Sequence, residues 1–241
     1  MRLFGWTALA FGLAFASASA AADPQPVIDN PEVQVLDLRL AKGEATPPTS
    51  ATQDTVILYA SAGAVRVEPE KKPAGKAQPE KAQAEKGSAE TGQGEEQTHQ
   101  FGDAVFIPKG ARVHVAAMGP EPVHLVMITL KAAPNRIENG TGLPLAFPRP
   151  GAVKRLDNAK VVVWNYTWRK NVPTPMHFHD KDVVLAYRYD GTVRSTALDG
   201  MFVDNAYSAG EVRFNKGDRV HSEQLLSARQ SAVMMELKPQ N

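Results

Sequence analysis

The sequence lacks cysteine altogether, so disulfide bonds cannot stabilise this protein and a thiol cannot serve as its nucleophile. It also lacks an excess of either charge, with 27 Lys and Arg against 26 Asp and Glu. A balanced surface argues against nucleic acid or an anionic membrane as the main partner. The patterns G-x-x-x-x-G-K, G-x-G-x-x-G after a strand and G-x-S-x-G are absent. Nucleotide-dependent enzymes and serine hydrolases are therefore disfavoured.

Long apolar runs are absent as well, except at the N-terminus. Arg2 supplies a short positive region, residues 3–15 are mostly apolar, and small residues at 18–22 provide cleavage sites. This run is shorter than the ~20 apolar residues needed to cross a bilayer, so a cleaved signal peptide at residues 1–22 is favoured over a membrane anchor. We therefore expect a periplasmic or secreted protein with no stable membrane insertion after cleavage.

Residues 68–100 contain no Phe, Tyr or Trp and no aliphatic residue larger than alanine. Lys, Glu, Gln, Ala, Gly and Pro make up most of this stretch, which cannot bury enough apolar surface to offset its ordering entropy. A solvated helix over part of it is the alternative, but the interspersed prolines and glycines oppose helix formation. The composition predicts a disordered, low-complexity insertion.

Elsewhere, short strand-like segments alternate with Gly and Pro turns, and no long segment has the 3.6-residue period of a helix. The strongest strand signals lie at residues 33–40, 56–59, 104–107, 123–130 and 183–187. A connector rich in Pro, Gly and Asn, at residues 132–158, separates a first unit (23–131) from a second (159–241). This pattern predicts an all-β protein.

The second unit repeats the first. Residues 33–66 align without a gap with residues 161–194, and Arg112-Val113-His114 aligns with Arg219-Val220-His221. The first copy is longer between these two blocks, which is where the low-complexity stretch lies. The sequence is therefore a tandem duplication of one β unit.

Both copies resemble the two signature motifs of the cupin superfamily. At the positions of the first motif, G-x5-H-x-H-x4-E-x6-G, the second copy has Asn171, His177, His179, Val184 and Gly191, and the first has Gly43, Thr49, Ala51, Val56 and Gly63. At those of the second motif, G-x5-P-x-G-x2-H-x3-N, the first copy has Gly102, Pro108, Gly110, Val113 and Ala117, and the second has Ala209, Asn215, Gly217, Val220 and Gln224. The resemblance implies a bicupin, with two double-stranded β-helix (jelly-roll) barrels in tandem.

In metal-binding cupins, three histidines and a glutamate hold a first-row divalent ion. The first copy keeps neither histidine of the first motif, whereas the second keeps His177 and His179 but has Val184 in place of the glutamate. Side chains two residues apart on a strand share a face, so this pair can bind one ion. The resemblance implies a site for Fe, Mn, Zn, Cu or Ni on His177, His179 and His221.

His221 stands one residue beyond the expected position, which Val220 occupies. If Val220 keeps the inward position, His221 points outward unless a β-bulge turns it. His114 holds the same place in the copy without the pair, so a structural role for His221 is the alternative.

Glu223 is the one weak catalytic candidate, and Gln224 and Tyr187 are candidate pocket residues. Asp182 and Arg219 recur in the first copy, which favours structural roles for both.

Two functions remain open. The second unit could be a mononuclear metal enzyme acting on a small polar organic molecule. Alternatively, the protein could be a non-catalytic binding or structural bicupin without a functional metal. In either case the expected partner is a small molecule, with a homodimer as a further option.

Overall fold

The computed structural model describes residues 24–47, 49–67 and 96–239. These residues form an all-β protein, and no helix occurs among them. The strands are β1 (Ile28–Asp29), β2 (Val33–Leu40), β3 (Thr49–Ser50), β4 (Thr55–Tyr59), β5 (Gly63–Val67), β6 (Glu96–His99), β7 (Ala104–Ile107), β8 (Arg112–Val113), β9 (Val115–Ala117), β10 (Val123–Leu130), β11 (Val153–Asp157), β12 (Val161–Trp168), β13 (His177–His179), β14 (Val183–Tyr187), β15 (Gly191–Thr196), β16 (Phe202–Tyr207), β17 (Val212–Asn215), β18 (Arg219–Leu225) and β19 (Gln230–Leu237). Within this part of the chain, no helix could span a membrane.

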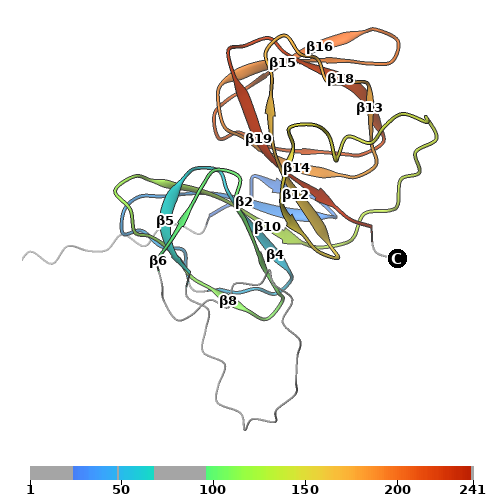
Figure 1. Cartoon of the computed structure of the whole chain (residues 1–241). Coiled ribbons are helices and arrows are strands. Elements are labelled where there is room, and N and C mark those ends of the chain that lie inside the picture. Colours follow the sequence, from blue (N-terminus) through green and yellow to red (C-terminus); the bar gives the residue numbers. More distant parts are fainter. Residues whose placement is uncertain (1–23, 48, 68–95, 240–241) are drawn as a thin grey trace, which may run out of the picture.

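The two halves of the chain repeat one arrangement of strands (Figure 1). The N-terminal half has a five-stranded sheet in the order β1-β2-β10-β4-β7, and the C-terminal half has one in the order β11-β12-β19-β14-β17. Smaller sheets stand opposite them: β3-β8 and β6-β5-β9 in the first half, and β13-β18-β15-β16 in the second. All strand pairs within these sheets are antiparallel. The structural repeat follows the repeat in the sequence.

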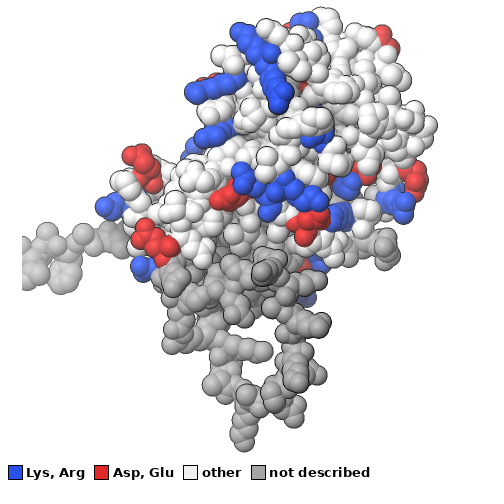
Figure 2. Space-filling view, in the orientation of Figure 1, with Lys and Arg blue, Asp and Glu red and all other residues white. Residues whose placement is uncertain are grey.

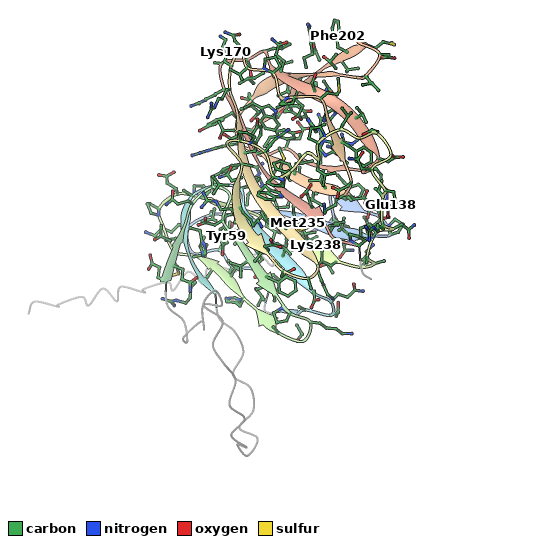
Figure 3. The ribbon with its side chains drawn as sticks, turned by 45° about the vertical axis from the view of Figure 1, so that its right-hand side comes forward. Tyr59, Glu138, Lys170, Phe202, Met235 and Lys238 are labelled. Carbon is green, nitrogen blue, oxygen red and sulfur yellow. The ribbon has the colours of Figure 1, made fainter. Side chains whose placement is uncertain are left out.

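The two five-stranded sheets pack against each other through a shared hydrophobic core. Alternate residues of each strand enter it, so Val161 and Val163 of β12 lie in the shared core, whereas Val162 and Trp164 face the interior of the C-terminal half. Met235 of β19 is fully buried at this junction (Figure 3). Because both faces of β4 and β14 are covered, these two strands are apolar at nearly every position.

The predicted signal peptide, residues 1–22, lies outside the described residues, as does most of the predicted insertion. The predicted end of that insertion, at residue 100, is wrong, because Glu96–His99 form strand β6. This strand pairs with β5, where His99 faces Gly63, and the His99 ring stacks on Tyr59 at 3.7 Å. A polar strand of this kind is stabilised by backbone hydrogen bonds and one ring contact, and neither leaves a hydrophobic pattern.

The predicted connector also ends earlier than expected. Its last residues, Val153–Asp157, form β11 and pair with β12, with an irregularity between Lys154 and Leu156. The segment before β11 contributes to the core of the C-terminal half, because Ala146 and Phe147 are buried in it. The C-terminal structural unit therefore includes residues assigned to the connector.

Surface charge follows the balanced composition. On the face shown in Figure 2, Lys and Arg side chains lie beside Asp and Glu side chains over both halves. Within the described chain, several oppositely charged side chains form close pairs, such as Arg194 with Asp204 at 2.7 Å. Pairs of this exposed kind contribute little to stability.

Candidate metal centre

Strand β13 places two imidazoles inside the C-terminal half. His177 and His179 are 3% and 8% exposed, and both rings face inward because they lie two residues apart. Phe178, between them, faces the other way and exchanges backbone hydrogen bonds with the connector: its N–H donates to Pro144 and its carbonyl accepts from Ala146. These bonds hold the short strand in register and fix the direction of the histidine pair.

Strand β18 brings the third imidazole to the same place. His221 lies directly opposite His177 in the antiparallel pair β13–β18, and Arg219 lies opposite His179. The sequence pattern indicated that His221 would point outward unless a β-bulge turned it, but the β13–β18 register runs without a bulge. The extra residue falls in the turn before β18, where Asp218 has a φ of 56°. Arg219, His221 and Glu223 therefore lie on the inward face of β18. The alignment of Val220 with the motif histidine had predicted the opposite orientation of this strand.

The three Nε2 atoms converge. His179 Nε2 lies 3.2 Å from His177 Nε2 and 3.1 Å from His221 Nε2, and the three ligand atoms all lie within 4.8 Å of one another. Nitrogens bound to one ion at about 2.1 Å, with angles of about 90–110°, are about 3.0–3.4 Å apart. The spacing therefore fits three adjacent ligands of a small divalent ion.

Neighbouring groups orient the outer ring nitrogens. His177 Nδ1 lies 2.8 Å from the carbonyl oxygen of Pro175, which can only accept, so Nδ1 carries the proton and Nε2 keeps its lone pair. His221 Nδ1 lies 3.0 Å from the hydroxyl of Ser195 on β15. The carbonyl contact fixes the tautomer of His177, and the Ser195 hydroxyl, which can donate or accept, orients the ring of His221.

Burial keeps all three rings neutral. It is the largest cause lowering the pKa of His177, and it lowers the pKa of His221 to about 4. The pKa of His179 is lowered furthest, by burial and then by the positive charge of Arg219. Unprotonated imidazoles present lone pairs at neutral pH, as metal binding requires.

Glu223 lies beside this cluster, with its Oε1 atom 3.9 Å from His221 Nε2. Its Oε2 atom accepts hydrogen bonds from Arg149 Nη1 at 3.0 Å and from Trp168 Nε1 at 3.2 Å. Burial raises the pKa of this carboxyl, but the positive charge of Arg149 and the hydrogen bond from Trp168 oppose burial, and the pKa lies below its usual value. Glu223 is therefore a buried carboxylate at neutral pH.

The position that aligns with the glutamate of the first cupin motif holds an uncharged valine, Val184. Val184 faces the shared core, and its neighbour Val183 lines the interior instead. A different carboxyl, that of Glu236 on β19, is buried in this interior and accepts a hydrogen bond from Trp164 Nε1 at 2.9 Å. Burial raises the pKa of Glu236, in contrast to that of Glu223.

A cavity of about 510 Å³ opens beside the histidines. Its lining includes His179, His221, Glu223 and the candidate pocket residue Tyr187, whose ring stacks on Tyr207 at 3.9 Å. Gln224, the other pocket candidate, does not line it, because strand alternation places its side chain on the opposite face of β18 from Glu223.

Sequence reasoning missed four charged residues of this cavity: Arg149, Arg213, Arg219 and Glu236. Arg149 comes from the connector, far from either motif. Arg219 had been assigned a structural role because the first copy shares it, and Glu236 is a single carboxylate inside an apolar strand. Glu236 could have been noticed, since an acidic residue in a buried strand usually has a partner. Asp182 has the predicted strand-end role, with Oδ1 accepting from the backbone N–H of Gly217 at 2.7 Å.

The N-terminal half has no comparable cluster among its described residues. Ala51 stands where the second histidine of the pair would be, and it packs beside the core of this half. That core includes Val113 and Val115, which flank His114. Among the described residues, the histidine cluster is found only in the second copy.

No family model and no curated protein matches the sequence. Solved structures do match the fold. A cupin 2 conserved barrel domain protein from Leptotrichia buccalis has a TM-score of 0.51 at 15% identity, over 89% of this chain and 88% of that protein. The chain has a cupin-type fold.

Two further cupin-type neighbours show how much this fold accommodates. Bacillus subtilis oxalate decarboxylase, which has Mn(II) centres, matches with a TM-score of 0.55 at 12% identity, over 87% of this chain and 69% of that one. Procruciferin, an 11S globulin from Brassica napus, matches with a TM-score of 0.60 at 9% identity, over 86% and 77%. At such identities the likeness supports the cupin fold alone, so function has to be argued from the site.

Proposed function

We propose that this protein is an exported bicupin, and that its C-terminal barrel binds one divalent first-row metal ion on His177, His179 and His221. One observation carries the proposal: three buried, neutral imidazoles direct their Nε2 atoms at a common point beside a cavity. His179 Nε2 lies 3.1–3.2 Å from the other two Nε2 atoms, a spacing that one small ion bound by all three nitrogens would produce.

In the proposed enzyme, a small polar organic molecule enters the cavity and reacts beside the metal. The ion would supply Lewis acidity and leave coordination positions open toward the cavity. Ser195 and the Pro175 carbonyl hold two of the rings in place, while Glu223 keeps a negative charge next to His221. A Mn(II)-containing neighbour of the same fold supports a first-row metal without deciding which one.

Metal content tests the site directly. The mature protein should carry about one divalent ion per chain by elemental analysis, and His177→Ala/His179→Ala should carry almost none. His114→Ala is the matched control, because His114 holds the repeat position of His221 in the half without the pair. Equal metal in the double variant and the wild type would exclude the site.

A non-catalytic binding or structural role is the second candidate. The observation that favours this role is the absence of a carboxylate ligand. Val184 occupies the position of the motif glutamate and faces the shared core, and Glu223 accepts hydrogen bonds from Arg149 and Trp168. A metal-free wild-type protein whose melting temperature does not rise with any divalent ion would support this role.

A further inference from the structure

Three arginines line the cavity of the C-terminal half, and two of them are already occupied. Arg149 donates to Glu223, and its guanidinium lies over the Tyr166 ring at 3.9 Å. Arg213 pairs with Glu211, donates to the carbonyl of Ala206 and lies over the Tyr207 ring. Neither guanidinium is available as the main contact for a ligand.

Arg219 is different. Its Nε donates to the backbone carbonyl of Lys216 at 2.7 Å, but within the described chain it forms no ion pair with a carboxylate. Its side chain is half-buried on the inward face of β18. A partly desolvated guanidinium whose terminal N–H groups lack an acidic partner favours an anion that presents two oxygens.

The position of Arg219 ties that anion to the candidate metal site. Arg219 lies directly opposite His179 in the β13–β18 pair and lines the same cavity as His179 and His221. An anion on Arg219 is therefore bound next to the three imidazoles, on the cavity side of the cluster.

Apolar side chains make up much of the remaining cavity wall, beside the polar residues Ser195, Asn205 and Asn215 and the carboxylates of Glu223 and Glu236. Val183, Leu185 and Met234 form part of its wall. Met201, Phe202 and Val203, around the start of β16, belong to its lining and yet are 72%, 56% and 63% exposed. Phe202 lies at the outer end of the C-terminal half in Figure 3. Exposed apolar side chains beside a cavity are typical of a ligand-binding rim.

The cavity is also large for a simple ion. Its volume of about 510 Å³ lies within the range of about 300–1,000 Å³ that holds drug-sized ligands. A small dicarboxylate would leave the apolar wall and the Met201–Val203 rim without contacts.

We propose that this cavity binds a monocarboxylate with an apolar body of aromatic size, its carboxylate on Arg219 and its body directed toward the rim of Met201, Phe202 and Val203. The inference deepens the proposed function, because it names the ligand class of the same site. It does not require the metal, since Arg219 and the rim belong to the protein itself.

Calorimetric titration of the mature, metal-loaded protein tests the ligand class with three probes. We expect 3-phenylpropionate to bind about tenfold or more tightly than its neutral amide, which lacks the charge, and than acetate, which lacks the apolar body. Equal binding of the acid and the amide would overturn the role of charge. Equal or tighter binding of acetate would overturn the role of the apolar body.

Variants assign the two ends of the ligand. Arg219→Gln should weaken 3-phenylpropionate by about tenfold or more and leave the amide unchanged, with Arg219→Lys intermediate. Phe202→Ser should weaken the binding of 3-phenylpropionate and leave that of acetate unchanged. Arg136→Gln, at a side chain that is 72% exposed and does not line this cavity, is the matched control. A wild-type affinity in Arg219→Gln would overturn the assignment.

Metal content measured on the same samples separates the two proposals. Discrimination between acid and amide by wild-type protein that takes up no divalent ion supports the carboxylate site and refutes the metal site. Full metal content without discrimination does the reverse. Circular dichroism melting confirms that each variant is folded, and Arg219→Lys keeps the test decisive if Arg219→Gln does not fold.

Discussion

Replacing Arg149 by methionine should destabilise the C-terminal half, because it leaves Glu223 buried without its ionic partner. The side chains of Arg149 and Glu223 are only 8% and 15% exposed. Removing one partner of a buried pair typically costs about 3–5 kcal/mol. Trp168 still donates to the same carboxylate oxygen, so we expect about 3 kcal/mol, at the lower end of that range.

The loss should depend on pH. In the wild type the pKa of Glu223 is held below its ordinary value, so its ionised form contributes stability above about pH 4.5 that is lost as the pH falls through the lowered pKa. Without Arg149, burial dominates and raises the pKa of Glu223 above its ordinary value. The deficit of the variant should therefore be largest at neutral pH and should shrink below about pH 4.5, where Glu223 is protonated.

Urea denaturation followed by tryptophan fluorescence measures both effects, because Trp164 and Trp168 lie in this half. Adding Glu223→Gln to Arg149→Met should recover most of the loss, since glutamine keeps an oxygen for Trp168 and removes the buried charge. Arg136→Met, which breaks an exposed pair, should cost less than about 0.5 kcal/mol. A loss below about 1 kcal/mol in Arg149→Met, or an equal loss at pH 4 and pH 7, would refute this reasoning.

Two other predictions concern stability. Met235→Ala removes a fully buried side chain from the shared core and should lower the free energy of unfolding, measured in urea, by about 2–5 kcal/mol. Met201→Ala, at a 72% exposed position, should lower it by less than about 0.5 kcal/mol. Similar losses in the two variants would mean that the junction is not a core. Replacing residues 68–95 by a five-residue turn should leave the melting temperature unchanged or slightly higher, because residues 197–201 suffice to join the equivalent strands β15 and β16. A fall of more than about 5 °C would contradict that expectation.

Much of the fold could be predicted because its information is local. The apolar runs of residues 123–130 and 183–187 coincide with β10 and β14, since buried strands need apolar residues on both faces. The repeat located the same strands twice. Strand β6 escaped prediction because its four polar residues are held by backbone pairing with β5, which leaves no pattern in side-chain polarity.

The sequence by itself determined that His177 and His179 share a face, because a strand alternates its side chains every two residues. Only the tertiary structure decided that His221 joins them. Which face of β18 turns inward depends on the register set by the turn at Asp218, and one residue of shift reverses every side chain of the strand. Tertiary structure likewise brought Arg149 from the connector to Glu223, a contact between residues 74 positions apart. Pairing and register over such distances are fixed by packing across the whole half, which local sequence does not encode.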